Sequence, residues 1–191
     1  MLTVLDFLTS PMGAASAAAA ALLFIFLAYC IAAGNTLARL MVKVQEAASG
    51  IDVALSKRYG VLKKVFEASK GYMAHEKYIV LESIKLRGGM PMEEKNRAAA
   101  RMDTAAVEIS AVGEAYPQLA SSEIFIQLQK SISDTEEHLQ AARRLYNANV
   151  SVLNQKIVSF PASVAAAMRG VKKQQMFVAQ EAHRADIDMT L

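Results

Sequence analysis

The side chains that could perform chemistry are few in this 191-residue chain, and they stand far apart. A hydrolase needs a nucleophile, a base and an orienting group in one cleft. His75 and Glu76 are adjacent, so they point to different sides of a helix. No His–His or Glu–His pair has the spacing of a helical metal site. The cysteine and the three histidines are Cys30, His75, His138 and His183. Because they form no such group, we expect no enzyme activity, no bound metal and no cofactor.

Phosphate and nucleic-acid chemistry are also disfavoured. Gly88-Gly89 is not followed by the Lys-Ser/Thr pair of a phosphate loop, so we interpret it as a helix stop. The net charge of +3 is a small basic excess, and the chain carries no known nucleic-acid-binding module. We expect no nucleic acid among its partners.

Polar residues at apolar positions of the expected third helix, with three tyrosines, allow two interpretations. The residues are Thr135, Asn149, Asn154, Tyr72, Tyr116 and Tyr146. The first interpretation is a buried hydrogen-bond network that fixes the register of packed helices, because buried polar groups are normally paired. The second is a site near the tyrosines for a peptide, a lipid headgroup or a small ligand, as in a sensor or adaptor. We favour the first.

Residues 13–33 form an uncharged, mostly apolar run that is long enough, as a helix, to cross a bilayer. All 21 Lys and Arg follow it, and residues 1–12 carry only Asp6 as a charged side chain. Basic flanks stay on the cytoplasmic side, so we expect a short extracytoplasmic N-terminus and a cytoplasmic domain. Two alternatives stay open. The first is a cleaved signal peptide, against which stands the lack of a basic region before the run. The second is a lipoprotein anchor at Cys30, against which stands the bulky Tyr29 that precedes it.

Apolar spacing and chain breaks predict four further helices, so the expected class is all-α. The first runs from residue 35 to about 87 and stops at Gly88-Gly89 and Pro91. The second covers residues 92–114. The third begins at a Ser121 or Ser122 cap after Tyr116-Pro117 and continues to 157. A short fourth helix covers residues 162–171. We assign residues 34–176 to one helical domain and 177–191 to a C-terminal tail.

The first of these helices carries an apolar seam with alternating spacings of four and three residues. It would be about 80 Å long, whereas the second would be about 35 Å, so the second helix cannot cover it. Either the last segments fold back onto the seam, or it pairs with a second copy or a neighbouring membrane protein. We expect self-association. The candidate residues are Leu37, Met41, Val44, Ala48, Ile51 and Leu55.

Charge is segregated along the chain. Residues 39–87 hold ten basic and five acidic side chains, residues 88–138 four and nine, and residues 139–173 six and none. We favour the interpretation in which oppositely charged helices pair across a bundle. Each such surface ion pair contributes little to stability. The alternative is a basic face between Arg143 and Lys173 that meets anionic lipid or an acidic partner.

Several motifs then resemble those of the LemA family over residues 35–180. They are an ID-V stretch at 51–53, a KRY at 57–59, KGY followed by HE at 70–76, EAYPQL at 114–119, ARR-x-YN at 142–147 and I-x-x-FP at 157–161. Two departures concern the first helix. Val61-Leu62-Lys63-Lys64 replaces a common proline-containing stretch, and Ala47-Ala48-Ser49 stands where a tryptophan is usual. The resemblance therefore assigns no partner surface to that part of the first helix.

The resemblance implies an N-terminal span followed by an elongated antiparallel four-helix bundle that faces the cytoplasm, with no catalytic residues. The family includes a magnetosome-membrane protein required for organelle biogenesis, and some members are linked to membrane-protein quality control. We therefore expect a membrane-anchored scaffold or assembly factor on a bacterial inner or organelle membrane. The motif residues carried over as candidates are Asp52, Arg58, Tyr59, Lys70, Gly71, Tyr72, His75, Glu76, Tyr116, Pro117, Arg143, Tyr146, Asn147, Phe160 and Pro161.

Overall fold

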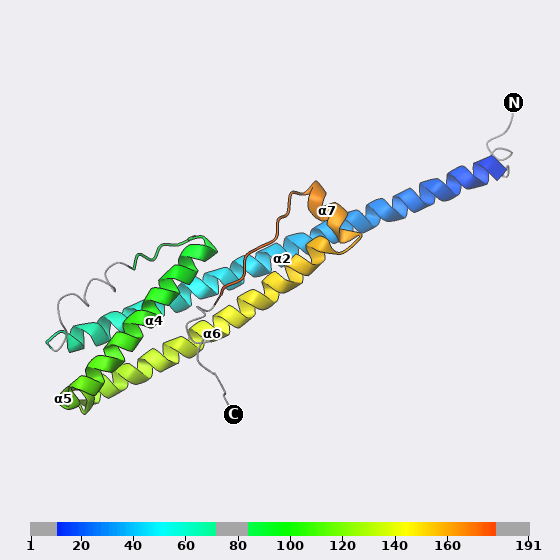
Figure 1. Cartoon of the computed structure of the whole chain (residues 1–191). Coiled ribbons are helices and arrows are strands. Elements are labelled where there is room, and N and C mark those ends of the chain that lie inside the picture. Colours follow the sequence, from blue (N-terminus) through cyan, green and yellow to red (C-terminus); the bar gives the residue numbers. More distant parts are fainter. Residues whose placement is uncertain (1–10, 72–83, 179–191) are drawn as a thin grey trace, which may run out of the picture. The chain divides into compact units, whose positions relative to one another are not determined.

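A computed structural model describes residues 11–71 and 84–178, and that part of the chain contains helices and no strand (Figure 1). The helices are α2 (Pro11–Ser69), α4 (Met92–Ala115), α5 (Pro117–Ala120), α6 (Glu123–Val158) and α7 (Ala162–Met168). The expected all-α class is confirmed. The chain divides into a first unit, Met1–Lys43 with Ser151–Gln174, and a second unit, Val44–Val150 with Gln175–Leu191.

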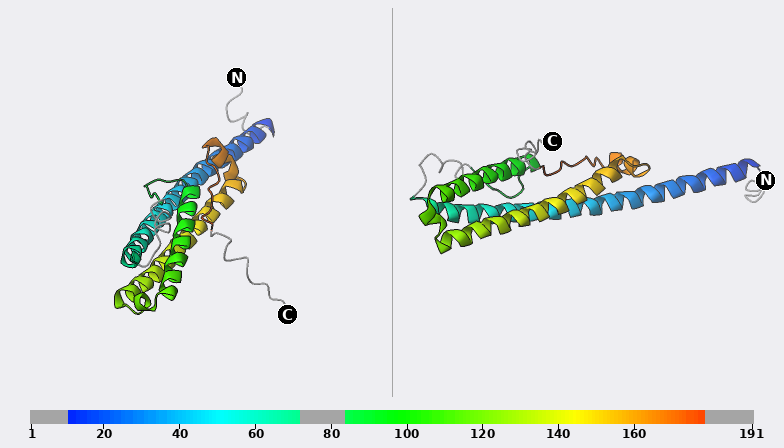
Figure 2. Two further views of the ribbon diagram at one scale, coloured as in Figure 1. Left: turned by 60° about the vertical axis from the view of Figure 1, so that its left-hand side comes forward. Right: turned by 60° about the horizontal axis from the view of Figure 1, so that its bottom comes forward.

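In the first unit, α7 packs beside the part of α2 that directly follows the apolar run. Three small residues of α7 are buried there, Ala162, Ala165 and Ala166. On α2, Leu37 is fully buried, and Arg169 Nη1 donates a 2.7 Å hydrogen bond to the carbonyl oxygen of Gly34. A Cβ at position 34 would lie 2.5 Å from Arg169 Cζ, so glycine is what admits the guanidinium. Figures 1 and 2 show the N-terminal part of α2 projecting beyond α7.

This projecting part of α2 is long and apolar enough to cross a membrane, judged by length and composition. Its large side chains face outward, and Leu22, Phe24 and Ile25 are each more than 60% exposed. Apolar side chains on this scale seldom stay in water. Residues 13–33 are therefore the candidate membrane-spanning segment, as the sequence indicates.

In the second unit, three helices pack together: the later half of α2, α4 and the first part of α6 (Figure 2). Asp52 pairs with Lys95 and Arg58 with Asp103, and because both numbers increase together, α4 runs parallel to α2. The α6 helix returns in the opposite direction. This differs from the antiparallel arrangement expected of α2 and α4. The core is formed by fully buried side chains, which include Ile51, Leu55, Leu62, Val65, Met102, Ile109 and Leu139.

The chain breaks agree with the sequence at most helix ends. Of the two predicted caps, Ser121 and Ser122, the structure confirms Ser122, whose hydroxyl accepts a hydrogen bond from the backbone N–H of Phe125. The α7 helix ends three residues earlier than expected, at Met168. Gly170 there has φ +63°, and Val171 N–H bonds back to Ala166, which is the Schellman arrangement that stops a helix.

Two further differences lie at the ends of other helices. The α2 helix ends at Ser69 and not near residue 87, because residues 70 and 71 form a turn and residues 84–87 are not helical. Gly71 is costly inside a helix, which favours a stop at this point. The short helix α5 fills the break at Tyr116-Pro117, and proline suits its first position, where an N–H would have no helical partner.

Close approach of α4 and α6 depends on Gly113. A Cβ at this position would lie 2.9 Å from Cε1 of Phe125, whose side chain is buried. Although Gly→Ala inside a helix is ordinarily favourable, Gly113→Ala is expected to lower the free energy of unfolding by about 1–3 kcal/mol through overpacking. Thermal unfolding in detergent micelles measures the change. The matched control is Gly50→Ala in α2, where nothing lies within 4 Å and a gain of about 0.5–1 kcal/mol is expected. A stabilised Gly113→Ala variant would contradict the packing argument.

Candidate functional site

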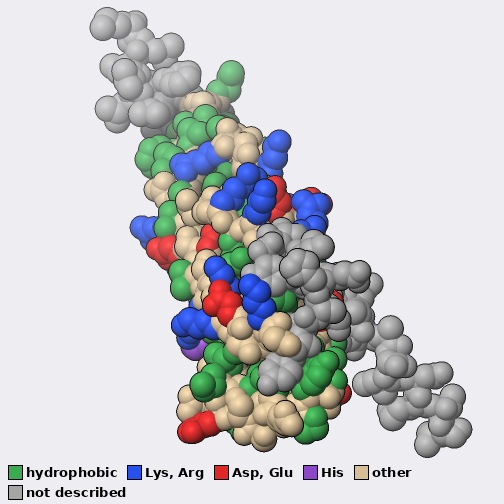
Figure 3. Space-filling view, turned by 90° about the vertical axis from the view of Figure 1, so that its left-hand side faces the viewer, with side chains coloured by type: hydrophobic (Ala, Val, Ile, Leu, Met, Phe, Trp, Pro, Cys, Tyr) green, Lys and Arg blue, Asp and Glu red, His purple; other side chains and the backbone are tan. Residues whose placement is uncertain are grey.

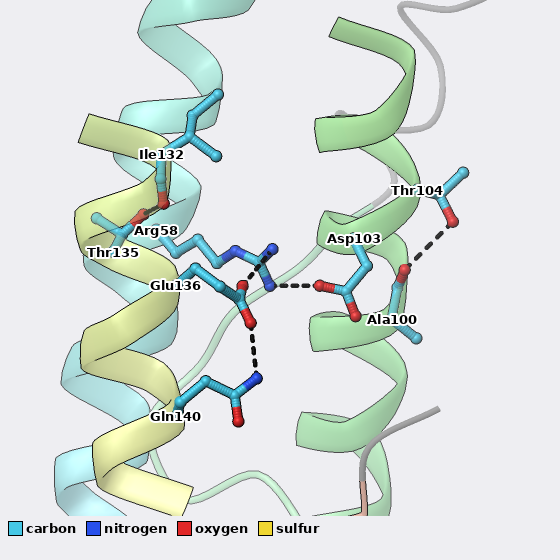
Figure 4. A network of polar contacts seen from close by, with 8 residues as sticks. All are labelled: Arg58, Ala100, Asp103, Thr104, Ile132, Thr135, Glu136 and Gln140. Atoms are coloured by element: carbon cyan, nitrogen blue, oxygen red, sulfur yellow. Dashed lines mark hydrogen bonds and ion pairs between the residues drawn. The ribbon is translucent and has the colours of Figure 1, made fainter. Parts of the chain in front are cut away.

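A buried arginine joins the three helices of the second unit (Figure 4). The side chain of Arg58, on α2, is 4% exposed, and its Nη1 lies 2.6 Å from Oδ1 of Asp103 on α4. Its Nη2 lies 2.7 Å from Oε2 of Glu136 on α6. Gln140, one turn further along α6, donates a 2.8 Å hydrogen bond to the other oxygen of Glu136. A buried charge of this kind is tolerated because it is paired.

This arrangement, which we call the Arg58 triad, suits packing better than catalysis. Both carboxylates are ion-paired with the same guanidinium, so their oxygens are engaged in holding α4 and α6 against α2. Thr135, beside Glu136 on α6, is buried and bonds the carbonyl of Ile132 in its own helix. The predicted network role of Thr135 is therefore local.

A second buried cation links α2 and α4. The ammonium of Lys95 lies 2.7 Å from Oδ1 of Asp52, and it also donates to the carbonyl oxygen of Ala48 at 3.3 Å. Its side chain is 4% exposed. Lys95 is not among the residues predicted from the sequence. The available signal was its position on the apolar stripe of α4, one turn before Ala98 and two turns before Met102.

The ARR-x-YN motif of α6 binds the chain's own extended segment at residues 175–178. The Tyr146 hydroxyl donates to the carbonyl oxygen of Gln175 at 2.8 Å. Asn147 contacts a single residue twice, because its amide donates to the Phe177 carbonyl at 2.9 Å and accepts from the Phe177 N–H at 2.8 Å. The guanidinium of Arg143 lies 5.0 Å from the centre of the Phe177 ring. Asn96 of α4 completes the set by accepting from the N–H of Val178 at 3.2 Å.

We call Asn96, Arg143, Tyr146 and Asn147 the C-terminal clasp. Its hydrogen bonds go to backbone groups, so it recognises an extended peptide through its main chain and through one aromatic side chain. Phe177 is 2% exposed, whereas its neighbours Met176 and Val178 are 44% and 62% exposed, which is the alternation of an extended strand. Phe177 was assigned from the sequence to the C-terminal tail.

The first unit repeats this kind of contact once. The amide of Asn154 donates to the carbonyl of Gln174 and accepts from its N–H, both at 2.9 Å. Asn147 and Asn154 are seven residues apart on α6, so they share one face of that helix. Side-chain amides at this spacing provide the hydrogen bonds that a neighbouring strand would otherwise supply.

Burial raises the pKa of the Tyr146 hydroxyl above its ordinary value of 10.0. Below pH 10 the folded and unfolded chains both keep this proton, so the contribution of the clasp is complete there. As the pH rises further, the unfolded chain releases the proton first, and stability falls. We expect urea midpoints in detergent to fall more steeply above pH 10 in the native chain than in Tyr146→Phe. Equal slopes between pH 9 and 11 would contradict this assignment.

The remaining predicted residues fall into three groups. Tyr72, His75 and Glu76 lie outside the described residues. Tyr116 is 43% exposed at the end of α4, before α6 begins, whereas Tyr146 lies about 35 Å of helix rise beyond the start of α6, so these two tyrosines do not form a common site. The others lie at helix ends or on the surface: Tyr59 half-buried on α2, Lys70 and Gly71 in the turn after it, Pro117 opening α5, Phe160 80% exposed and Pro161 preceding α7.

The seam residues of α2 are mostly covered by the chain itself. Leu37, Val44, Ile51 and Leu55 are buried, Ala48 is half-buried and Met41 is 43% exposed. In the first unit, the last segments fold back onto α2, which was one of the two possibilities considered for this seam. Self-association stays a prediction, and of these six residues Met41 is the most exposed.

Charged groups of both signs are interspersed on one face of the molecule (Figure 3). In the described residues, no group of three His, Cys, Asp or Glu side chains is placed to hold a metal ion. Among the described residues, the Arg58 triad, the Lys95–Asp52 pair and the C-terminal clasp all bind other parts of this chain.

In the part of the chain that the structure describes, a long apolar helix joined to ion-paired helices defines an all-helical protein with one candidate membrane-spanning segment. The chain belongs to the LemA family, whose model matches residues 47–190. It is also 28% identical to Protein LemA of Metamycoplasma hominis over 163 residues, which cover 81% of this chain and 73% of that protein. The family predicted from the sequence motifs is thereby confirmed.

Proposed function

We propose that this protein is a non-enzymatic, membrane-anchored helical scaffold or assembly factor. Residues 13–33 would span a bacterial inner membrane or an organelle membrane, with the N-terminus outside and residues 34–176 in the cytoplasm. The observation that carries the proposal is the continuity of α2, which runs from Pro11 to Ser69 without a break. The candidate span and the packed domain share one helix.

The chemistry of the polar sites supports a structural role. Asp52, Arg58 and Asn147, three of the candidate motif residues, bind groups of the same chain. Each of these contacts connects segments that are distant in sequence. Polar groups used in this way fix the arrangement of the helices. A scaffold at a membrane needs such a fixed arrangement to present a constant surface to its partners.

Its orientation follows from charge. Arg39 and Lys43 closely follow the apolar run, and no basic side chain precedes it. The proposal is tested with single cysteines in a Cys30→Ala background, one at Thr3→Cys and one at Val107→Cys, which is 63% exposed on α4. A membrane-impermeant maleimide is expected to label position 3 in intact spheroplasts and position 107 only after permeabilisation. The reverse pattern would overturn the orientation.

The partners we propose are a second copy of the chain or neighbouring membrane proteins. A cysteine for cross-linking is placed at Met41, the most exposed of the six seam residues. In the same Cys30→Ala background, oxidative or bismaleimide cross-linking in native membranes is expected to give intermolecular products. Lys43→Cys, two residues away, is the control for proximity without a specific interface. If neither a second copy nor a partner is captured at Met41→Cys above that control, the scaffold role loses its support.

A further inference from the structure

The turn between α6 and α7 exposes apolar side chains. Phe160 and Met168 are 80% and 78% exposed, and Val158 is 58% exposed. We call residues 158–168 the α6–α7 tip. Three of its four alanines, Ala162, Ala165 and Ala166, are buried, whereas its largest apolar side chains point to solvent. The exposed side chains of the tip are thus the ones whose transfer from water to an apolar environment is most favourable.

The tip is held beside the end of the apolar run. The hydrogen bond from Arg169 reaches the carbonyl of Gly34, the residue directly after residues 13–33. Ala33 and Leu37, on either side of Gly34, are buried. If residues 13–33 span the membrane, as the proposed function requires, the boundary between lipid and water lies at this level.

The charge of the first unit matches an anionic surface. Its described residues, 11–43 and 151–174, include no Asp or Glu at all. Their six basic side chains are Arg39, Lys43, Lys156, Arg169, Lys172 and Lys173. Basic groups within a Debye length of an anionic leaflet are attracted to its headgroups. An exposed apolar tip with adjacent basic groups is the composition of an interfacial membrane contact.

We propose that the α6–α7 tip is a second membrane contact, which docks on the anionic phospholipid surface of the leaflet that α2 crosses. Phe160 and Met168 enter the boundary between headgroups and acyl chains, while the lysines and arginines meet lipid phosphates. Two points of attachment, the span and the tip, then fix the rotation of α2 about its own axis. The inference rests on the proposed span and adds a lipid-binding site to it.

The chain contains no tryptophan, so one introduced tryptophan is a specific reporter. The full chain carrying Phe160→Trp is reconstituted into vesicles of zwitterionic lipid with or without anionic phosphatidylglycerol, prepared with brominated acyl chains. We expect a blue-shifted emission and strong quenching that increase with the anionic lipid and decrease in high salt. Met168→Trp is a second reporter on the same tip, should position 160 prove sensitive to substitution.

Two control positions separate the possible failures. Leu22→Trp lies in the candidate span, and its quenching establishes that the span is inserted. Val107→Trp, exposed on α4 in the second unit, is expected to remain unquenched. Unquenched tryptophan at both tip positions with a quenched Leu22→Trp overturns the tip contact and leaves the span intact. An unquenched Leu22→Trp would overturn the proposed anchor itself.

The charge requirement is tested separately with Lys172→Gln combined with Lys173→Gln in the Phe160→Trp chain. The ratio of inserted to free tip in anionic vesicles is expected to fall on the order of tenfold, while zwitterionic vesicles show little change. Equal quenching in both lipids, or quenching of Val107→Trp as strong as that of Phe160→Trp, overturns a specific anionic contact.

Discussion

Replacing both acids of the Arg58 triad, with Asp103→Asn and Glu136→Gln, is expected to lower the free energy of unfolding by about 3 kcal/mol. The double variant leaves a guanidinium that is 4% exposed without a counter-charge, and an unpaired buried charge is strongly destabilising. For a chain of this length the melting temperature should fall by about 6–12 °C. Circular dichroism on the full chain in detergent measures the fall.

The informative comparison is Arg58→Met, which removes the cation itself. Asp103 and Glu136 are 49% and 36% exposed, so water can solvate them once the arginine is gone. Replacing a buried ion pair with an apolar side chain of similar size is often neutral, so Arg58→Met should be far milder than the double variant. Glu93→Gln, which breaks the exposed pair with Arg97, should change stability by less than about 1 kcal/mol. An Arg58→Met variant as unstable as the double variant would show that the attraction itself provides the stability.

The helices were predictable because their signals are local. The third predicted helix has apolar positions at steps of three and four over more than 30 residues, and α6 covers that stretch. Ser122 sits where a capping hydroxyl is needed, and Tyr116-Pro117 marks a break that the structure retains. These features depend on neighbouring residues alone, so the sequence carries them in full.

Pairing between helices was less accessible. The Lys95–Asp52 and Arg58–Asp103 pairs require α4 to run parallel to α2, which ends at Ser69. A helix extending to residue 87 would have given the opposite direction. Charge segregation indicated that opposite signs would meet, but it could not select the partners, because many acids lie within reach of each base in an undetermined register.

The C-terminal clasp shows a different limit of sequence reasoning. Arg143, Tyr146 and Asn147 were selected as motif residues, and Tyr146 was also placed in a buried network or a ligand site. The segment that they bind was not predicted, because it has no helical period. The missing half of the site is Phe177, a single aromatic residue near the C-terminus. Hydrogen bonds to backbone groups do not require particular side chains in the segment that is bound. The sequence therefore identified only the α6 side of this contact.

Truncating that aromatic residue, with Phe177→Ala, is expected to cost about 3 kcal/mol or more. The ring is 2% exposed and lies against the Arg143 guanidinium, so its removal loses burial, packing and a cation–π contact together. The loss of stability is global or local, and a different measurement detects each case. A clasp that unfolds with the rest of the second unit lowers the melting temperature, whereas a segment that detaches alone speeds amide exchange at residues 177 and 178.

Hydrogen exchange and thermal unfolding of the same variant distinguish these two cases. Met176→Ala is the matched control, because it removes a side chain of similar size from the adjacent residue, which is 44% exposed and faces away. That change should stay within about 0.5 kcal/mol. The loss of stability in Asn147→Ala should lie between those of Phe177→Ala and Met176→Ala, since the N–H and the carbonyl of Phe177 both lose a partner. If Phe177→Ala and Met176→Ala prove equivalent in both measurements, residues 175–178 contribute no stability, and the C-terminal clasp is then a contact without energetic consequence.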